Sequence, residues 1–179
     1  MKFIKILLGI IVILIIIFIV GGLFLPKTYS VSRSTVIQAP DSTIYKSIAD
    51  FKEFYKWNPW AKMDPSAVTT FSGTPATPGH QYNWKGKETG AGYMKIRTLQ
   101  ANKDLDIELK FIEPFESMAD TKFAITPEQG GNKVTWTMSG ENNMISKWMC
   151  VIMGGMDKMI GKDFESGLAN LKEKVEKGN

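Results

Sequence analysis

The first strong pattern along the chain is an uninterrupted apolar stretch. Residues 6–25 contain no charged or strongly polar side chain, and as a helix rising 1.5 Å per residue they would span about 30 Å, the thickness of a bilayer's hydrocarbon core. No side of the segment is polar, unlike a helix that covers a soluble core. We therefore predict a membrane anchor over residues 1–27, a single transmembrane helix that includes Ile6, Leu14, Phe18 and Leu25.

A cleaved signal peptide is the competing interpretation of this stretch. Signal peptides have a shorter apolar region and small residues at the cleavage site, whereas Gly21 and Gly22 are followed here by three large apolar residues. Two lysines and the amino terminus precede the stretch, and Lys27 and Arg33 follow it. The excess of positive charge on the amino-terminal side favours a cytoplasmic amino terminus and an extracytoplasmic domain.

Residues 28–179 have the patterns of one domain. Residues 29–38 are rich in Val, Thr, Ser and Ile and predict a strand, which Ala39 and Pro40 end. Asp41 or Ser42 can cap the helix that follows. Apolar residues at helical spacing indicate two short helices between residues 41 and 58, before Pro59 ends helical structure.

Beyond residue 65 the apolar period changes to two. Apolar and polar residues alternate in six runs, which Gly, Pro and Asn separate: 68–71, 80–85, 94–98, 105–111, 121–125 and 134–138. This pattern predicts an antiparallel meander with one apolar face and one solvated face.

The last pattern again has a helical period. Apolar residues recur at every third or fourth position from Met149 to Val175, and Ser146 can cap the start. We predict a single helix of about 30 residues, or about 45 Å. Each glycine inside a helix costs up to about 1 kcal/mol relative to alanine. We therefore expect a bend or a close approach to another element at Gly154, Gly155, Gly161 and Gly167.

Charge and rare residues exclude several chemistries. The chain has 22 basic and 18 acidic residues, a net charge of +4, and these charges are interspersed, which disfavours nucleic-acid binding. With one cysteine, Cys150, and one histidine, His80, the chain can form neither an internal disulfide nor a structural zinc site. Cys150 lies in an apolar run, as a small buried residue would. We predict no metal, no cofactor and no catalytic residue.

A series of short motifs covers nearly all of residues 29–175. They include Val36-Ile37-Gln38-Ala39-Pro40, Trp57-Asn58-Pro59-Trp60, Tyr82-Asn83-Trp84, Glu113-Pro114-Phe115 and Gly161-Lys162-Asp163-Phe164. In order and spacing they resemble the START-like helix-grip superfamily, also called SRPBCC, and within it the polyketide cyclase/dehydrase-like bacterial proteins with one N-terminal membrane segment. The resemblance implies an α+β fold, in which a curved antiparallel sheet wraps around a long C-terminal helix. It also implies a deep cavity, often occupied by a lipid, sterol or polyketide, but no fixed chemistry.

The inward-facing aromatic residues and methionines are the candidate ligand contacts. Methionine adapts to varied apolar partners, and ten in this length is a high number. The alternative is that the same residues only fill the core. The candidates are Tyr82, Trp84, Met94, Ile96, Phe111, Phe123, Trp136, Met138, Met149, Met153 and Met156.

Three functions remain open at this point. The first is membrane-anchored, non-enzymatic binding of a hydrophobic small molecule or lipid. The second is a cyclase- or hydratase-like enzyme, which requires a buried titratable group in the cavity, whereas Asp104, Asp106 and Glu108 alternate on the outer face of their strand. The third is a protein-interaction module with a filled core and an exposed apolar patch. The ligand, a protein partner and the oligomeric state cannot be predicted from the sequence.

Overall fold

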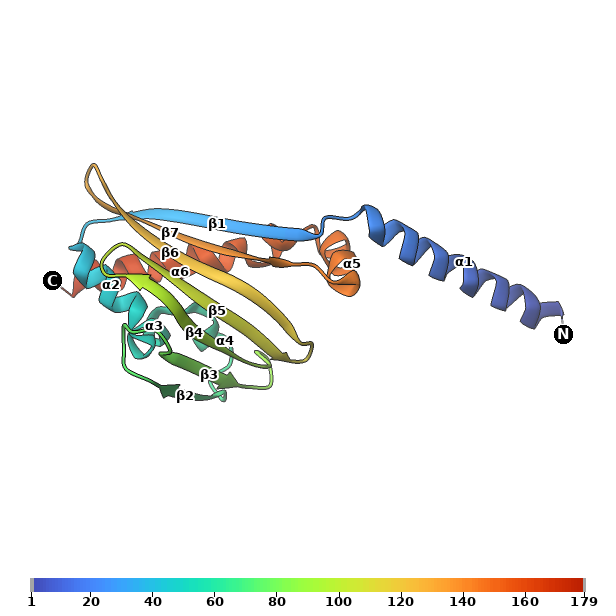
Figure 1. Cartoon of the computed structure of the whole chain (residues 1–179), viewed down its shortest axis with the longest axis horizontal. Helices are drawn as coiled ribbons and strands as arrows, with labels where there is room; N and C mark the ends of the chain where they lie inside the picture. Colours follow the sequence, from blue (N-terminus) through green and yellow to red (C-terminus); the bar gives the residue numbers. More distant parts are fainter. Residues whose placement is uncertain (1, 179) are drawn as a thin grey trace.

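The computed structural model describes residues 2–178. The helix α1 (Lys2–Phe24) extends away from a compact domain, into which it leads (Figure 1). The domain begins with β1 (Thr28–Ile37) and three short helices, α2 (Asp41–Ala49), α3 (Phe51–Trp57) and α4 (Pro59–Met63). Six strands follow: β2 (Val68–Ser72), β3 (Gln81–Lys85), β4 (Ala91–Gln100), β5 (Asp104–Glu113), β6 (Ser117–Glu128) and β7 (Gly131–Glu141). Two helices end the chain, α5 (Met144–Met153) and α6 (Met156–Lys177).

The seven strands form one antiparallel sheet in the order β1-β7-β6-β5-β4-β3-β2. The alternation of apolar and polar residues produces this sheet, because one face of each strand is buried and the other is solvated. The sheet curves around α6, which packs on β1 and β7 (Figure 1). The predicted α+β helix-grip fold is confirmed.

The strand register defines two ends of the sheet. Thr28 pairs with Glu141, and the turn between β5 and β6 (residues 114–116) lies at this same end, from which α1 extends (Figure 1). We refer to it as the anchor-proximal end. The distal end carries Ile37 and the turn between β6 and β7.

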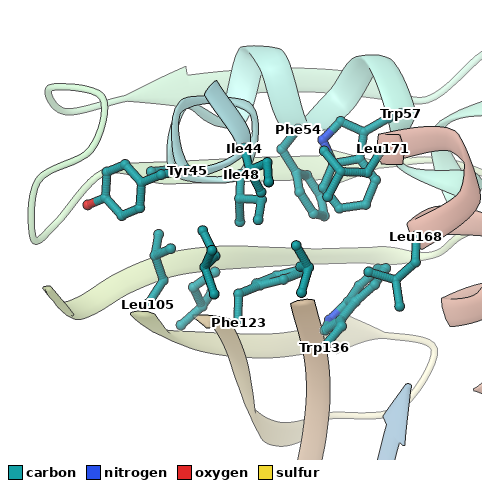
Figure 2. Packing of buried hydrophobic residues seen from close by; sticks show 14 of the residues in the cluster. Ile44, Tyr45, Ile48, Phe54, Trp57, Leu105, Phe123, Trp136, Leu168 and Leu171 are labelled. Atoms are coloured by element: carbon teal, nitrogen blue, oxygen red, sulfur yellow. The ribbon is translucent and has the colours of Figure 1, made fainter. Parts of the chain in front are cut away.

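The filled core lies in the distal half of the domain. Ile44 and Ile48 of α2 and Phe54 of α3 face Leu105 and Phe123 of the sheet (Figure 2), and all five are completely buried. The carboxyl-terminal half of α6 closes this core with Leu168, Leu171 and Val175. The regularly spaced apolar residues of α2, α3 and α6 therefore pack into one common core.

The predicted single C-terminal helix is wrong. The chain breaks into α5 and α6 at Gly154 and Gly155, whose φ angles of 82° and 97° suit glycine and not other residues. The bend expected at these glycines is thus a complete break. Gly161 and Gly167 make the expected close approaches, to Arg33 and Trp136 respectively.

Two predicted helix caps are also wrong. Asn143, and not Ser146, caps α5, because its side-chain oxygen accepts a hydrogen bond from the Ser146 amide at 2.8 Å. Neither Asp41 nor Ser42 caps α2: Pro40 is the preceding residue, and Asp41 is the first helical residue. In both cases the capping residue lies earlier in the sequence than predicted, and such small displacements are common at helix ends.

Arg33 of β1 connects the first half of α6 to the sheet through ion pairs. It donates to Asp157 at 2.7 Å and to Glu165 at 2.6 Å, and hydrogen bonding from Arg33 lowers the pKa of Asp157. A side chain at Gly161 would overlap the Arg33 guanidinium, so it would displace the arginine from its present position. The ion pairs hold the half of α6 that lies beyond the filled core.

Substitution of Leu171 by alanine tests how much the packing of α6 against the core contributes to stability. Leu171 is completely buried, and its truncation should lower the free energy of unfolding by about 2–5 kcal/mol. Ser166→Ala on the exposed side of the same helix should change it by about 0.5 kcal/mol or less. Urea unfolding of the detergent-solubilised protein, followed by tryptophan fluorescence, measures both. Equal effects would contradict the packing of α6 described here.

Candidate functional site

A cavity of about 350 Å³ lies between the helices and the inner face of the sheet. It occupies the anchor-proximal half of the domain, because its strand residues, such as Trp84, Phe111 and Met138, lie toward that end of the register. The helices α2 and α3 fill the distal half, whereas the anchor-proximal half is covered by the five-residue α4 and the start of α6. The volume is at the small end of the range for ligand pockets.

The cavity wall is largely apolar and aromatic. Inward positions of the central strands provide Tyr82, Trp84, Met94, Leu109, Phe111, Thr121, Trp136 and Met138. These residues share a face because successive strand residues point to opposite sides of the sheet. The helices contribute Tyr55, Asn58, Trp60, Ala61, Met63, Ile160 and Phe164.

The sequence-based candidates fall into three groups. Six line the cavity: Tyr82, Trp84, Met94, Phe111, Trp136 and Met138. Ile96 and Phe123 lie on the same face of the sheet but are completely buried in the filled core. The third group lies away from the cavity lining: Met149 and Met153 are exposed on α5, and Met156 is half-buried against the core at the start of α6.

Several lining residues were missed by the sequence analysis. Asn58 and Trp60 belong to the Trp57–Trp60 motif, and both reach the cavity, whereas Trp57 is buried and donates its indole N–H to the Ser47 carbonyl at 2.8 Å. Ala61, Met63 and Asp64 follow in α4 and the next loop. Residues in a short helix and a loop have no long periodic pattern, so the motif itself was the available signal.

Two polar atoms of the cavity-lining residues lack a protein partner. The Thr121 hydroxyl and the Trp136 indole N–H are buried and form no hydrogen bond within residues 2–178. An unpaired buried polar group is costly. Burial, followed by the nearby Tyr55, raises the pKa of Tyr82, so its hydroxyl stays neutral and able to donate.

Asp64 is a carboxylate at the cavity wall, and its oxygens are held by several donors. One oxygen accepts from the Ser66 hydroxyl at 2.7 Å, and the other accepts from the Glu88 amide at 2.9 Å. These bonds, with Ser66 the strongest, lower the pKa of Asp64 to about 2. A side chain at Gly86 would overlap the carboxylate. Asp64 therefore ties the loop after α4 to the β3–β4 loop as an ionised group.

His80 is completely buried at the entry to β3 and is absent from the cavity lining. Its Nε2 accepts from the Phe51 amide at 3.1 Å, and its Nδ1 lies 2.9 Å from the Ser72 carbonyl oxygen. Because a carbonyl can only accept, Nδ1 carries the proton and the ring is neutral. His80 thus joins α3 to the end of β2. Within residues 2–178, no three His, Cys, Asp or Glu side chains are grouped to hold a metal.

A curved sheet that grips a C-terminal helix over an apolar cavity defines the helix-grip class of proteins. Residues 28–176 match the model of the family described as polyketide cyclase / dehydrase and lipid transport. The chain belongs to this family. No curated protein matches the chain in a sequence search.

Solved structures of low sequence identity have the same fold. An uncharacterised protein from Rhizobium leguminosarum is 17% identical, with a TM-score of 0.61 over 84% of this chain and 96% of its own. Ms6760 from Mycobacterium smegmatis is 18% identical, with a TM-score of 0.59 over 84% and 92%. The Aha1 dimer from Colwellia psychrerythraea is 16% identical, with a TM-score of 0.56 over 82% and 96%. These chains contain little beyond the domain.

The lowered pKa of Asp64 predicts a pH-dependent stability. Its folded pKa of about 2 lies below the ordinary value of 3.8, so ionised Asp64 stabilises the fold above about pH 4 and loses this effect as the pH falls toward 2. In urea unfolding, Asp64→Asn should be less stable than the wild type at neutral pH, and the difference should shrink between about pH 4 and 2.

Asp163→Asn is the matched control, because Asp163 forms no side-chain hydrogen bond or ion pair among the described residues. Its unfolding free energy should follow the wild-type pH profile. A difference between Asp64→Asn and the wild type that stayed constant from neutral pH to pH 2 would contradict the assigned role of Asp64.

Proposed function

We propose that this protein binds a small apolar molecule, or the apolar part of a lipid, in the cavity while anchored to a membrane by α1. The observation that carries the proposal is the cavity of about 350 Å³ lined by aromatic residues and methionine. The family description, which includes lipid transport, supports the same type of ligand.

Asp64, one of the two carboxylates that line the cavity, is poorly suited to acid–base catalysis. A general acid or base works best with a pKa near the operating pH, whereas hydrogen bonds lower the pKa of Asp64 to about 2. Its oxygens are also engaged by Ser66 and the β3–β4 loop. Asp64 is therefore suited to hold the cavity wall together and not to exchange a proton with a ligand.

The helix α1 supports the membrane part of the proposal. It has 23 residues and is long and apolar enough to cross a bilayer. The folded domain also contacts its last turns, because Trp148 and Lys147 of α5 donate hydrogen bonds to the carbonyl oxygens of Phe18 and Gly22. Such contacts favour a retained anchor over a cleaved signal peptide. Lys2 and Lys5 before α1 favour a cytoplasmic amino terminus and an extracytoplasmic domain.

Ligand binding is tested by native mass spectrometry of residues 28–179, mixed with fatty acids and phospholipids. We expect the wild-type domain to gain a reproducible mass that organic extraction removes. Ala61→Trp places a large ring at the cavity wall, from a half-exposed position in α4. This variant should reduce the affinity for the bound lipid by about tenfold or more.

Ala169→Trp on the exposed side of α6 is the matched control and should bind as the wild type does. A wild-type domain that takes up no lipid would contradict the proposed binding. Equal binding by both tryptophan variants would place the ligand elsewhere on the domain.

Membrane anchoring is tested with the full chain. After an alkaline carbonate wash, the protein should stay in the membrane pellet, because about 20 apolar residues insert into the hydrocarbon core. A variant that lacks residues 2–25 should be released into the supernatant. If the wild-type protein is released, or if its mature form starts after residue 25, the anchor proposal fails.

A further inference from the structure

The helix α5 exposes apolar side chains that the domain does not cover. Its sequence, Met144–Met153, has Lys147 as its one charged residue. Ile152 is 81% exposed, Ile145 57% and Val151 52%, and Met149 and Met153 are also exposed. The break at Gly154 and Gly155 directs α5 away from the core that α6 covers. Such a contiguous apolar surface requires a partner or a lipid environment.

The covered side of α5 is docked on α1. The Trp148 indole N–H donates to the Phe18 carbonyl at 3.0 Å, and the two rings stack with their centroids 5.6 Å apart. The buried Lys147 ammonium donates to the Gly22 carbonyl at 3.0 Å. That carbonyl belongs to the last turn of α1, where carbonyls lack a partner within the helix and a cation is favourable.

The glycines of α1 make this docking possible. A side chain at Gly21 would lie 2.8 Å from the Trp148 ring, and one at Gly22 would overlap Met144. The linker between α1 and β1 is also held, because the Asn142 amide donates to the Lys27 carbonyl at 2.7 Å. The position of α5 along α1 is therefore defined by contacts on both sides of the linker.

The depth of these contacts along α1 indicates what covers the exposed apolar face of α5. Phe18 precedes Phe24 by six residues, which is about 9 Å along the helix axis. If α1 crosses a bilayer, Trp148 and α5 lie at the depth of its last two turns. Amphipathic helices that lie in a membrane interface are buried by about 5–10 Å. Tryptophan is also enriched at this boundary.

We propose that α5 is an interfacial membrane helix, whose exposed apolar face is covered by bilayer lipid beside the anchor. This inference rests on the proposed anchoring by α1. A second exposed apolar group, Ile112, Phe115 and Met118, lies at the turn between β5 and β6, at the same anchor-proximal end of the sheet. The lipid surface thus meets the end of the domain that contains the cavity. A second copy or another protein is the competing occupant, and the depth of the α1 contacts favours lipid.

The test places an environment-sensitive fluorophore, bimane, on single cysteines of the full chain in vesicles of equal amounts of phosphatidylcholine and phosphatidylglycerol. The background is Cys150→Ser, because Cys150 is the only cysteine. The three positions are Ile152→Cys on α5, Leu14→Cys in α1 and Ser166→Cys on the exposed side of α6. Lipids that carry a nitroxide, either near the headgroup or near the end of the acyl chain, serve as depth-dependent quenchers.

We expect the label at Ile152 to emit at shorter wavelength and to be quenched several-fold more than the label at Ser166, most strongly by the headgroup-proximal nitroxide. The label at Leu14 should respond most to the nitroxide at the chain end. Quenching at Leu14 without quenching at Ile152 would overturn the role of α5 and leave the anchor intact. A short-wavelength but unquenched label at Ile152 would indicate a protein partner and also overturn it. An unquenched Leu14 would refute the anchor itself.

Discussion

The indole of Trp136 lies between two other aromatic rings, and the positions of both the core and the cavity depend on this stack. Its centroid is 4.9 Å from that of Phe123 on the adjacent strand and 4.1 Å from that of Phe164 on α6. Gly167 lets the helix approach, since a side chain there would lie 2.8 Å from the Trp136 ring. The stack fixes the distance between α6 and the sheet. On its distal side the residues interdigitate, and on its anchor-proximal side they enclose a space.

The cavity remains open because helices cover the distal half of the sheet more completely than the anchor-proximal half. In the distal half, α2 and α3 contribute fully buried residues such as Ile48 and Phe54, while α6 contributes Leu171. In the other half, α4 has five residues, and the chain that could have continued α6 turns away at Gly154 and Gly155. Close packing at native density requires side chains from both the sheet and the helices. Over the anchor-proximal half, the helices supply too few side chains to fill the space.

Periodicity predicted the elements of this fold but not the neighbours that each element meets. Alternation correctly placed Trp84, Ile96 and Phe123 on one face of the sheet, yet Trp84 lines the cavity while the other two fill the core. The difference depends on which helix lies opposite, and that is a long-range property. Helical spacing likewise placed Met149 in one long helix. The apolar spacing continues across Gly154 and Gly155, but the positive φ angles of these two residues break the helix. Asp64 lies in a loop, outside any periodic pattern.

The same structural asymmetry connects the cavity with the proposed membrane surface. Because α6 begins after Gly155, α5 is free to lie against α1, and its own apolar residues stay outside the domain. Asn142 holds two residues of the linker between α1 and β1, Pro26 and Lys27, through their carbonyl oxygens, so the domain has a defined orientation on α1. A binding domain on a long flexible tether would sample many orientations. Here the cavity-bearing end stays at the end of the proposed anchor, which would shorten the path of the proposed ligand between bilayer and cavity.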